Sequence, residues 1–190
     1  EACLDWVILR GRLTESTPRG GMLAVSLPAE DLETYLADNC DLAASNSPGL
    51  SVASGAVADI ETLEKRLEEA EIDCQRVQVD RAGHSRLFEP ILDEFRRFIE
   101  GLDLQPPTVP IISNRTGQLL TNEQATDPNY WVDHLRNSVQ FSTGLSTVLE
   151  TPGRVLVEVG PGQALCSFAR QQPAQGALAN IIPACRHRAD

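Results

Sequence analysis

The amino-acid sequence predicts an α/β fold in which a ferredoxin-like module stands between a first helix and a second α/β portion. Over residues 22–79 the pattern is strand-helix-strand-strand-helix-strand, the split βαβ arrangement. Beyond it, helical apolar stripes alternate with short apolar runs, which is typical of helices that cover a sheet. We therefore expect residues 1–20 to form the helix and loop of a larger subdomain, residues 21–80 the ferredoxin-like subdomain, and residues 81–190 the remainder of the larger one.

The first helix is expected over residues 2–13. Apolar residues recur there near helical spacing, and Arg10 and Arg12 give its second half a positive charge. Because the first six residues already have a mid-helix pattern, we expect the natural chain to continue upstream. Pro18 and the glycines after it indicate a loop at residues 14–21.

The ferredoxin-like module has two amphipathic helices. The second carries Ile60, Leu63 and Leu67 at three- and four-residue spacing, opposite a charged face. A turn that contains Pro48 and Gly49 separates the two middle strands. The expected strands are residues 22–27, 42–46, 50–55 and 72–79, and the expected helices are residues 28–39 and 58–70.

The second α/β portion begins with an apolar helical stripe at residues 87–99. An apolar run at residues 154–159, bounded by Gly153 and Gly160, predicts a central strand that is buried on both faces. The other expected elements are a buried strand at 109–113, a polar loop at 118–129, helices at 130–135, 142–149 and 163–171, and a last strand at 181–182.

Composition and charge exclude several kinds of protein. The 190 residues include no apolar run long enough to span a bilayer, and the net charge of −11 repels nucleic acids and anionic membranes. With three histidines and no Cys-x-x-Cys pair, we expect no metal site. The five cysteines are odd in number and widely spaced, which favours reduced thiols in a cytoplasmic protein over a disulfide framework. They are Cys3, Cys40, Cys74, Cys166 and Cys185.

The turn at residues 80–86 lies between a predicted strand and a predicted helix, which is the setting of a nucleophile elbow. Leu87 occupies the second glycine position of Gly-x-Ser-x-Gly, so a serine hydrolase that uses Ser85 is the least favoured function. Ser85 suits the N-cap of the following helix instead. His84 is a candidate general base, although a lone histidine is more often structural.

Several motifs follow one another in an order and spacing that is specific to one family. They are LRGRL at 9–13, GMLAV at 21–25, NSP at 46–48, GHS at 83–85, EPIL at 89–92, PIISNRTG at 110–117, YW at 130–131, VQF at 139–141 and EVGPG at 158–162. With them the sequence resembles the C-terminal two-thirds of an acyltransferase domain of a modular polyketide synthase, a family that includes malonyl-CoA:acyl carrier protein transacylases. The resemblance implies an α/β-hydrolase-like larger subdomain that is interrupted by a ferredoxin-like smaller one.

The resemblance also implies roles for individual residues. His84 matches the catalytic histidine, and Arg10 matches the arginine that binds the free carboxylate of a malonyl-type extender. Backbone carbonyls near Asn114 and His134 match those that hold the imidazole. Without the resemblance, Arg10 is an ordinary cation near a helix C-terminus, and the imidazole of His134 has no assigned function.

The three residues before His84 match the family's selectivity positions. Arg81, Ala82 and Gly83 stand where His-Ala-Phe goes with malonyl and Tyr-Ala-Ser with methylmalonyl. Gly83 removes the bulky ring that blocks a branched extender, whereas Ala82 is common to both patterns. The overall resemblance favours malonyl, but one methylene is worth only about 1–3 kcal/mol, so the extender's substituent stays open.

The family's nucleophile is expected to lie outside this sequence. The serine stands in a Gly-His-Ser-x-Gly elbow some two dozen residues before the arginine that Arg10 matches, and its oxyanion-hole donors lie there or earlier. We therefore expect this polypeptide alone to form no acyl-enzyme.

The resemblance implies transfer of a malonyl-type extender from coenzyme A to the enzyme serine, and then to the phosphopantetheine thiol of an acyl carrier protein. It also implies that no cofactor is permanently bound. The implied partners are the carrier protein, the ketosynthase and linker domains of the same synthase, and the upstream half of the acyltransferase domain. The alternative is a non-catalytic docking or scaffold piece of a megasynthase, with a basic patch for an acidic carrier protein. Candidates for that patch are Arg81, Arg86, Arg96, Arg97 and Arg115.

Overall fold

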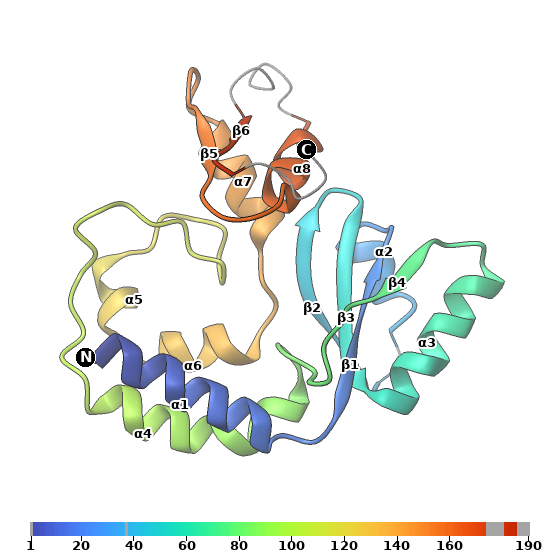
Figure 1. Cartoon of the computed structure of the whole chain (residues 1–190), viewed down its shortest axis with the longest axis horizontal. Helices are drawn as coiled ribbons and strands as arrows, with labels where there is room; N and C mark the ends of the chain where they lie inside the picture. Colours follow the sequence, from blue (N-terminus) through green and yellow to red (C-terminus); the bar gives the residue numbers. More distant parts are fainter. Residues whose placement is uncertain (1, 37, 174–180, 186–190) are drawn as a thin grey trace.

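The computed structural model describes residues 2–36, 38–173 and 181–185 (Figure 1). It begins with helix α1 (Ala2–Ser16), which is somewhat longer than the helix predicted at residues 2–13. The helix ends where the Ser16 hydroxyl donates to the Leu13 carbonyl at 2.7 Å. On α1 only Leu13 is buried, whereas Leu4 and Val7 are 63% and 67% exposed. The apolar stripe of α1 is therefore only partly covered by the described residues.

A four-stranded sheet follows α1. Its strands are β1 (Gly20–Val25), β2 (Cys40–Ser47), β3 (Leu50–Ala56) and β4 (Cys74–Arg76). They lie in the order β2-β3-β1-β4, and each neighbouring pair is antiparallel. This is the strand order of a ferredoxin-like unit, which confirms the predicted sequence of elements. The division of the chain at residues 20 and 80 remains a prediction.

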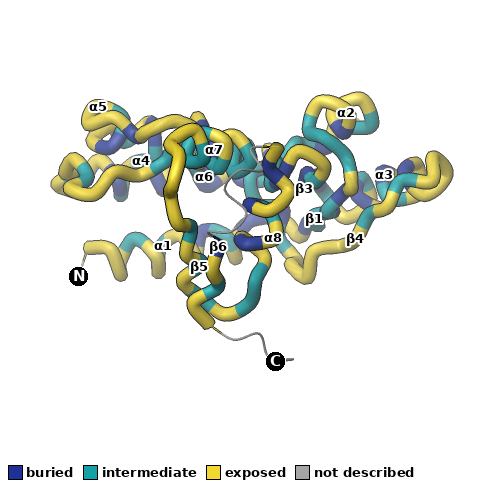
Figure 2. Tube along the Cα trace, turned by 90° about the horizontal axis from the view of Figure 1, so that it is seen from above, coloured by how far each residue is buried: buried dark blue, intermediate teal, exposed yellow. Residues whose placement is uncertain are grey.

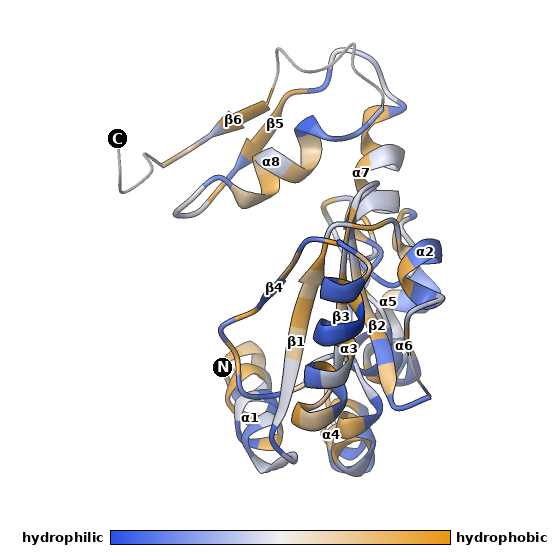
Figure 3. Cartoon of the chain, turned by 90° about the vertical axis from the view of Figure 1, so that its right-hand side faces the viewer, coloured by the Kyte–Doolittle hydropathy of each residue, from blue (hydrophilic) through white to orange (hydrophobic). Residues whose placement is uncertain are grey.

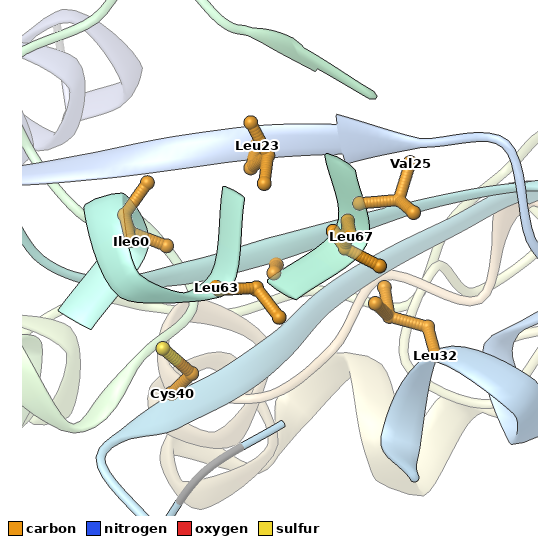
Figure 4. Packing of buried hydrophobic residues seen from close by; sticks show 8 residues of the cluster. Leu23, Val25, Leu32, Cys40, Ile60, Leu63 and Leu67 are labelled. Atoms are coloured by element: carbon orange, nitrogen blue, oxygen red, sulfur yellow. The ribbon is translucent and has the colours of Figure 1, made fainter. Parts of the chain in front are cut away.

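Helices α2 (Ala29–Glu33) and α3 (Val57–Glu69) cover one face of this sheet. The predicted three- and four-residue spacing on α3 is confirmed, because its buried residues are Ile60, Leu63 and Leu67. Each fully buried side chain of this size contributes about 1.5–3 kcal/mol. Figure 4 shows the cluster from close by, with Leu23, Val25, Leu32, Cys40, Ile60, Leu63 and Leu67 labelled.

Two elements of this unit are shorter than predicted. The helix expected at residues 28–39 ends at Glu33, and the strand expected at residues 72–79 pairs with β1 only over Cys74–Arg76. Val77 still donates its amide to the Met22 carbonyl at 2.9 Å, but Val77 and Val79 are exposed. The alternating pattern therefore predicted too long a strand, because Val77 and Val79 pack against no other layer of the described structure.

The opposite face of the sheet contacts the second portion of the chain. Val139 exchanges backbone hydrogen bonds with the edge strand β2, donating to Ala43 at 2.9 Å and accepting from Ser45 at 2.9 Å. It also packs against the buried residues Ala44 and Val52. Helix α7 (Phe141–Leu149) follows directly. The segment before α7 is thus fixed to the ferredoxin-like sheet.

The helical stripe predicted at residues 87–99 is divided in two. It forms a 3-10 helix, η1 (Arg86–Ile91), and then α4 (Leu92–Glu100). Pro90 lies inside η1 and supplies no amide donor, which explains the irregular first turns. Helix α4 packs with α1 and with α6 (Pro128–Arg136), as Figure 1 shows.

The strand and the loop expected after α4 are both wrong. Residues 109–113 form only one isolated bridge, between Ile112 and Leu119, and Val109 is 70% exposed. Within the expected polar loop, Thr121 caps a short helix, α5 (Asn122–Thr126), through a capping box with Gln124. The proline-rich sequence before residue 111 withholds amide donors from a sheet ladder, which explains the missing strand.

The C-terminal elements are β5 (Leu156–Glu158), α8 (Ala164–Arg170) and β6 (Ile181–Pro183). The strand predicted at residues 181–182 is confirmed, because β6 pairs with β5 in parallel. The prediction that residues 154–159 are buried on both faces is wrong for the described structure. Val157 is 53% exposed and Val159 is 87% exposed. Figure 2 shows strand β5 as exposed or intermediate in burial, and Figure 3 shows it as largely hydrophobic.

The described part of the chain has free thiols, no cluster of metal ligands and no membrane-spanning helix. Cys40 and Cys166 are buried, and all five thiols are free. Among the described residues, no metal-ligating side chains gather in a cluster that could hold an ion. The same residues contain no helix that is long and apolar enough to cross a membrane.

Candidate active site

Ser85 caps the helix that follows the turn at residues 80–86. Its hydroxyl donates to the Ala82 carbonyl at 2.7 Å and accepts from the Leu87 amide at 3.3 Å. The side chain is fully buried. The predicted N-cap is therefore confirmed, and these contacts leave Ser85 no access to a substrate.

His84 has a left-handed backbone with a φ of +57°. Non-glycine residues rarely adopt this conformation, although histidine does so more often than most. Its Nδ1 lies 2.9 Å from the carbonyl oxygen of Asn137. Because a carbonyl only accepts hydrogen bonds, Nδ1 carries the proton in the neutral ring, and the lone pair is on Nε2. The backbone hydrogen bond thus selects the tautomer that a general base needs.

The residues expected to hold His84 lie close by but make different contacts. The carbonyl of Asn114 accepts the amide of Gln140 at 2.6 Å. The backbone of His134 acts to raise the pKa of His84, but the hydrogen bond at 2.9 Å to the His84 ring comes from Asn137. Asn137 was not among the residues predicted from the sequence. Its position could have been found in principle, because Asn137 is the C-cap of α6 and the last carbonyls of a helix lack partners within it.

Burial lowers the pKa of His84 below its ordinary value of 6.5. The hydrogen bond to Asn137 and the backbone of His134 act to raise this pKa, whereas the charge of Arg10 lowers it further. The net shift is downward, so the imidazole is neutral at about pH 7 and can accept a proton.

His134 stands beside His84, with the two ring centroids 6.5 Å apart. Burial, together with His84, Arg10 and Arg115, lowers the pKa of His134 to about 4. Its ring packs near those of Tyr130 and Trp131, with centroid separations of 6.4 and 6.0 Å. The His134 side chain is thus part of an aromatic cluster on α6.

A hollow of about 850 Å³ brings the main site residues together. Arg10 and His84 both line it, with Gly83, Met22 and Phe88 around them. Arg10 is exposed on α1 and takes no part in the ion pairs among the described residues. With no carboxylate partner within the described part of the chain, this cation suits an anionic substrate in a hollow that also holds a neutral imidazole.

The three residues at the selectivity positions have different surroundings. Arg81 lines the hollow, and its guanidinium donates to the Glu15 carbonyl at 3.1 Å and pairs with Asp80 at 2.9 Å. Ala82 is fully buried and is not part of the hollow's lining. A Cβ on Gly83 would lie 3.9 Å from Met22 Sδ, an ordinary contact distance. Space for a side chain is therefore present at Gly83.

The fold and the hollow together define an α/β protein with a neutral histidine and a cation in one hollow, at the border between a ferredoxin-like unit and a helical layer. The chain belongs to the family described as "Acyl transferase domain", whose profile matches residues 1–188.

Relatives and solved structures agree with this assignment. A phenolphthiocerol/phthiocerol polyketide synthase of Mycobacterium tuberculosis is 35% identical over 187 residues, which cover 98% of this chain and 13% of that protein. The acyl transferase domain of SpnD, solved in complex with 2-(pent-4-yn-1-yl)malonyl, superposes with a TM-score of 0.92 at 33% identity. It covers 100% of this chain and 46% of the solved chain. The acyltransferase domain of the second salinomycin synthase module is 36% identical, with a TM-score of 0.88, over 96% of this chain and 43% of that chain.

This chain therefore spans under half of those two solved acyltransferase chains and a small part of the mycobacterial synthase.

Proposed function

We propose that this chain is the part of a polyketide synthase acyltransferase domain that supplies the catalytic base and the carboxylate-binding arginine. The domain moves a malonyl-type extender from coenzyme A to an enzyme serine, and then to the phosphopantetheine thiol of an acyl carrier protein. The observation that carries the proposal is His84, which is neutral, held at Nδ1 by Asn137 and placed in one cleft with Arg10.

In the first step, Nε2 of His84 accepts the proton of the serine hydroxyl as the serine oxygen attacks the thioester carbonyl. The new carbon–oxygen bond forms, the carbon–sulfur bond breaks, and His84 returns the proton to the departing coenzyme A sulfur. The second step repeats this sequence with the carrier thiol as nucleophile and serine as leaving group. The Asn137 carbonyl stabilises the transient imidazolium through Nδ1, the part that a carboxylate plays in a protease triad.

Arg10 binds the free carboxylate of the extender. A guanidinium suits this role, because it presents a planar fork of donors to a carboxylate. The serine and the oxyanion-hole donors are supplied by the upstream half of the domain in this scheme. That half also covers the exposed apolar side chains of α1 and β5, of which Val7 and Val157 are 67% and 53% exposed. The assembled domain works in the cytoplasm beside the ketosynthase and linker domains of the same synthase, and it needs no bound cofactor.

Mass spectrometry of a reconstituted reaction tests the proposal. The domain that contains this chain and its upstream half is mixed with malonyl-CoA and a phosphopantetheinylated carrier protein. We expect malonyl on the carrier protein in the presence of the complete domain and none with residues 1–190 alone. Carrier binding without transfer by the complete domain would contradict the proposal and favour a docking or scaffold role.

The carboxylate contact is tested by Arg10→Ala. We expect malonyl transfer to fall by about 10- to 100-fold, the equivalent of losing a hydrogen-bonded charge worth about 1.5–3 kcal/mol, while acetyl transfer is retained or improved. Arg12→Ala is the matched control, because Arg12 is exposed on the same helix but does not line the cleft. Equal malonyl transfer by both variants would rule out Arg10 as the carboxylate ligand.

A further inference from the structure

An ion-paired cluster connects the two segments that form the His84–Asn137 hydrogen bond. Its members are Asp41, Arg86, Glu89 and Arg136, which we call the Asp41 cluster. Asp41 lies on β2 and contacts Arg86 at 3.1 Å and Arg136 at 3.4 Å. Arg136 also contacts Glu89 at 3.1 Å. One carboxylate on the ferredoxin-like sheet thus touches two arginines from the second portion of the chain.

Each arginine stands next to one partner of the His84–Asn137 hydrogen bond. Arg86 follows His84 by two residues, and its backbone amide donates to Asp41 Oδ2 at 2.8 Å. Its guanidinium also donates to the Asp38 carbonyl. Arg136 directly precedes Asn137 at the end of α6. Asp41 therefore restrains the backbone of Arg86, close to His84, and the side chain of Arg136, next to Asn137.

Two members of the Asp41 cluster, Asp41 and Arg136, are more enclosed than a typical surface ion pair. The side chains of the other two, Arg86 and Glu89, are 42% and 60% exposed. The side chain of Asp41 is 17% exposed and that of Arg136 is 21% exposed. Burial acts to raise the pKa of Asp41, but hydrogen bonds from Arg86 and the charge of Arg136 hold it below its ordinary value of 3.8. Asp41 is therefore charged at neutral pH, and it accepts donors from both segments at once.

The left-handed backbone of His84 needs restraint from the surrounding structure. A non-glycine residue with a φ of +57° persists only where the surrounding structure holds it. Within the turn, the Ser85 hydroxyl donates to the Ala82 carbonyl. On the side of the sheet, the Arg86 amide donates to Asp41. Among the described residues, Asp41 is the one hydrogen-bond acceptor of the Arg86 amide, so its loss would free this side of the turn.

We propose that Asp41 is a positioning residue for the catalytic base, because it keeps His84 Nδ1 and the Asn137 carbonyl in register. The inference rests on the proposed function of His84. Asp41 touches no reacting atom in this scheme and acts only through the two arginines and the Arg86 amide.

Steady-state transfer by the complete acyltransferase domain tests the inference with Asp41→Asn. We expect kcat to fall about 10- to 100-fold, which is the effect of a misplacement of about 1 Å at a reacting group, with KM for the acyl-CoA unchanged. The acid limb of the pH profile should move to lower pH, because the Asn137 hydrogen bond raises the pKa of His84 and is weakened in the variant. A merely structural role would lower the yield of folded protein without moving this limb.

The matched control is Glu64→Gln. Glu64 pairs with Arg76 at 2.6 Å on the far side of the ferredoxin-like unit, and neither residue lines the cleft. We expect this variant to keep the wild-type kcat and pH profile. If Asp41→Asn folds poorly, Arg86→Gln is the second variant. It removes the side-chain pair between Arg86 and Asp41 but keeps the Asp41–Arg136 pair and the backbone amide contact, so it should show the same two changes in smaller measure.

Two outcomes separate the inference from the proposed function. Loss of transfer in His84→Asn, with wild-type kcat and pH profile in Asp41→Asn and Arg86→Gln, overturns the role of Asp41 alone. Full transfer in His84→Asn overturns the proposed function, whatever Asp41→Asn does.

Discussion

Two regions of the molecule each contribute a histidine to one neighbourhood, and the two rings differ in their hydrogen bonds and in the hollows that they line. The turn at residues 80–86 carries His84, helix α6 carries His134, and their ring centroids are 6.5 Å apart. Burial lowers the pKa of both rings. Only His84 lines the hollow of about 850 Å³, whereas His134 lines an apolar groove of about 260 Å³ beside Trp6 and Trp131.

The difference indicates which of the two rings suits the proposed role of general base. Proximity and a low pKa are shared, so neither distinguishes the two rings. Of the two, within the described residues, His84 alone has a ring nitrogen at 2.9 Å from a backbone carbonyl, that of Asn137, and this hydrogen bond fixes its tautomer. The left-handed backbone of His84 orients its ring differently from a helical residue. The ring of His134 instead has the orientation that its position in helix α6 sets.

Replacing each histidine in turn gives the largest expected effect. We expect His84→Asn to lower the rate of malonyl transfer by about 10²–10⁴-fold, the usual contribution of a positioned base, since asparagine tolerates the left-handed backbone but accepts no proton. His134→Phe preserves the aromatic packing and should change the rate by less than about 10-fold, the equivalent of roughly 1.4 kcal/mol. Transfer assays at neutral pH measure both. Equal losses of transfer rate in the two variants would contradict the assignment of the base role to His84 rather than His134.

The next largest effect is expected at the cleft side of the turn. Gly83→Phe should lower transfer of methylmalonyl relative to malonyl by about 10-fold or more, because the ring fills the space beside Met22 and Phe88. Gly83→Ala is the control, since its Cβ meets Met22 Sδ only at 3.9 Å. Competition between the two thioesters, read by mass spectrometry of the carrier protein, measures the ratio. An unchanged ratio in Gly83→Phe would separate Gly83 from extender selection.

The smallest effect concerns stability on the α6 side. The pKa of His134 is about 4 in the folded chain against an ordinary value of 6.5, so the unfolded chain binds more protons between these values. The contribution of the neutral ring to stability is complete above pH 6.5 and is lost as the pH falls toward about 4. We expect His134→Phe to reduce the fall in melting temperature on acidification across this window. An identical fall in wild type and variant would show that His134 is not the titrating group.

Much of the fold was predictable where one stretch of sequence carries its own signal. The spacing of Ile60, Leu63 and Leu67 predicted α3 because every fourth or third residue meets the same sheet. Helix α5 was predictable and missed, since Thr121 and Gln124 have the spacing of a capping box. The exposure of Val157 was not predictable, because burial depends on what covers a strand rather than on its own residues.

The site was predictable only in part, for a related reason. The motifs predicted His84 and Arg10 as site residues, and both line one hollow in the structure. The contact at Nδ1 comes from the backbone of Asn137, and a backbone carbonyl has no side-chain signature in the sequence. The link through Asp41 depends on β2 lying beside the end of α6, which is a property of the tertiary fold.

The ionisation of His84 itself gives the most direct test of its role as the base. Nitrogen-15 NMR of the imidazoles in the complete domain, recorded as a function of pH and assigned with His84→Asn and His134→Phe, reports the tautomer and the pKa of each ring. We expect a neutral His84 with its proton on Nδ1 and a pKa below 6.5. A proton on Nε2, or a pKa above 6.5, would contradict that role.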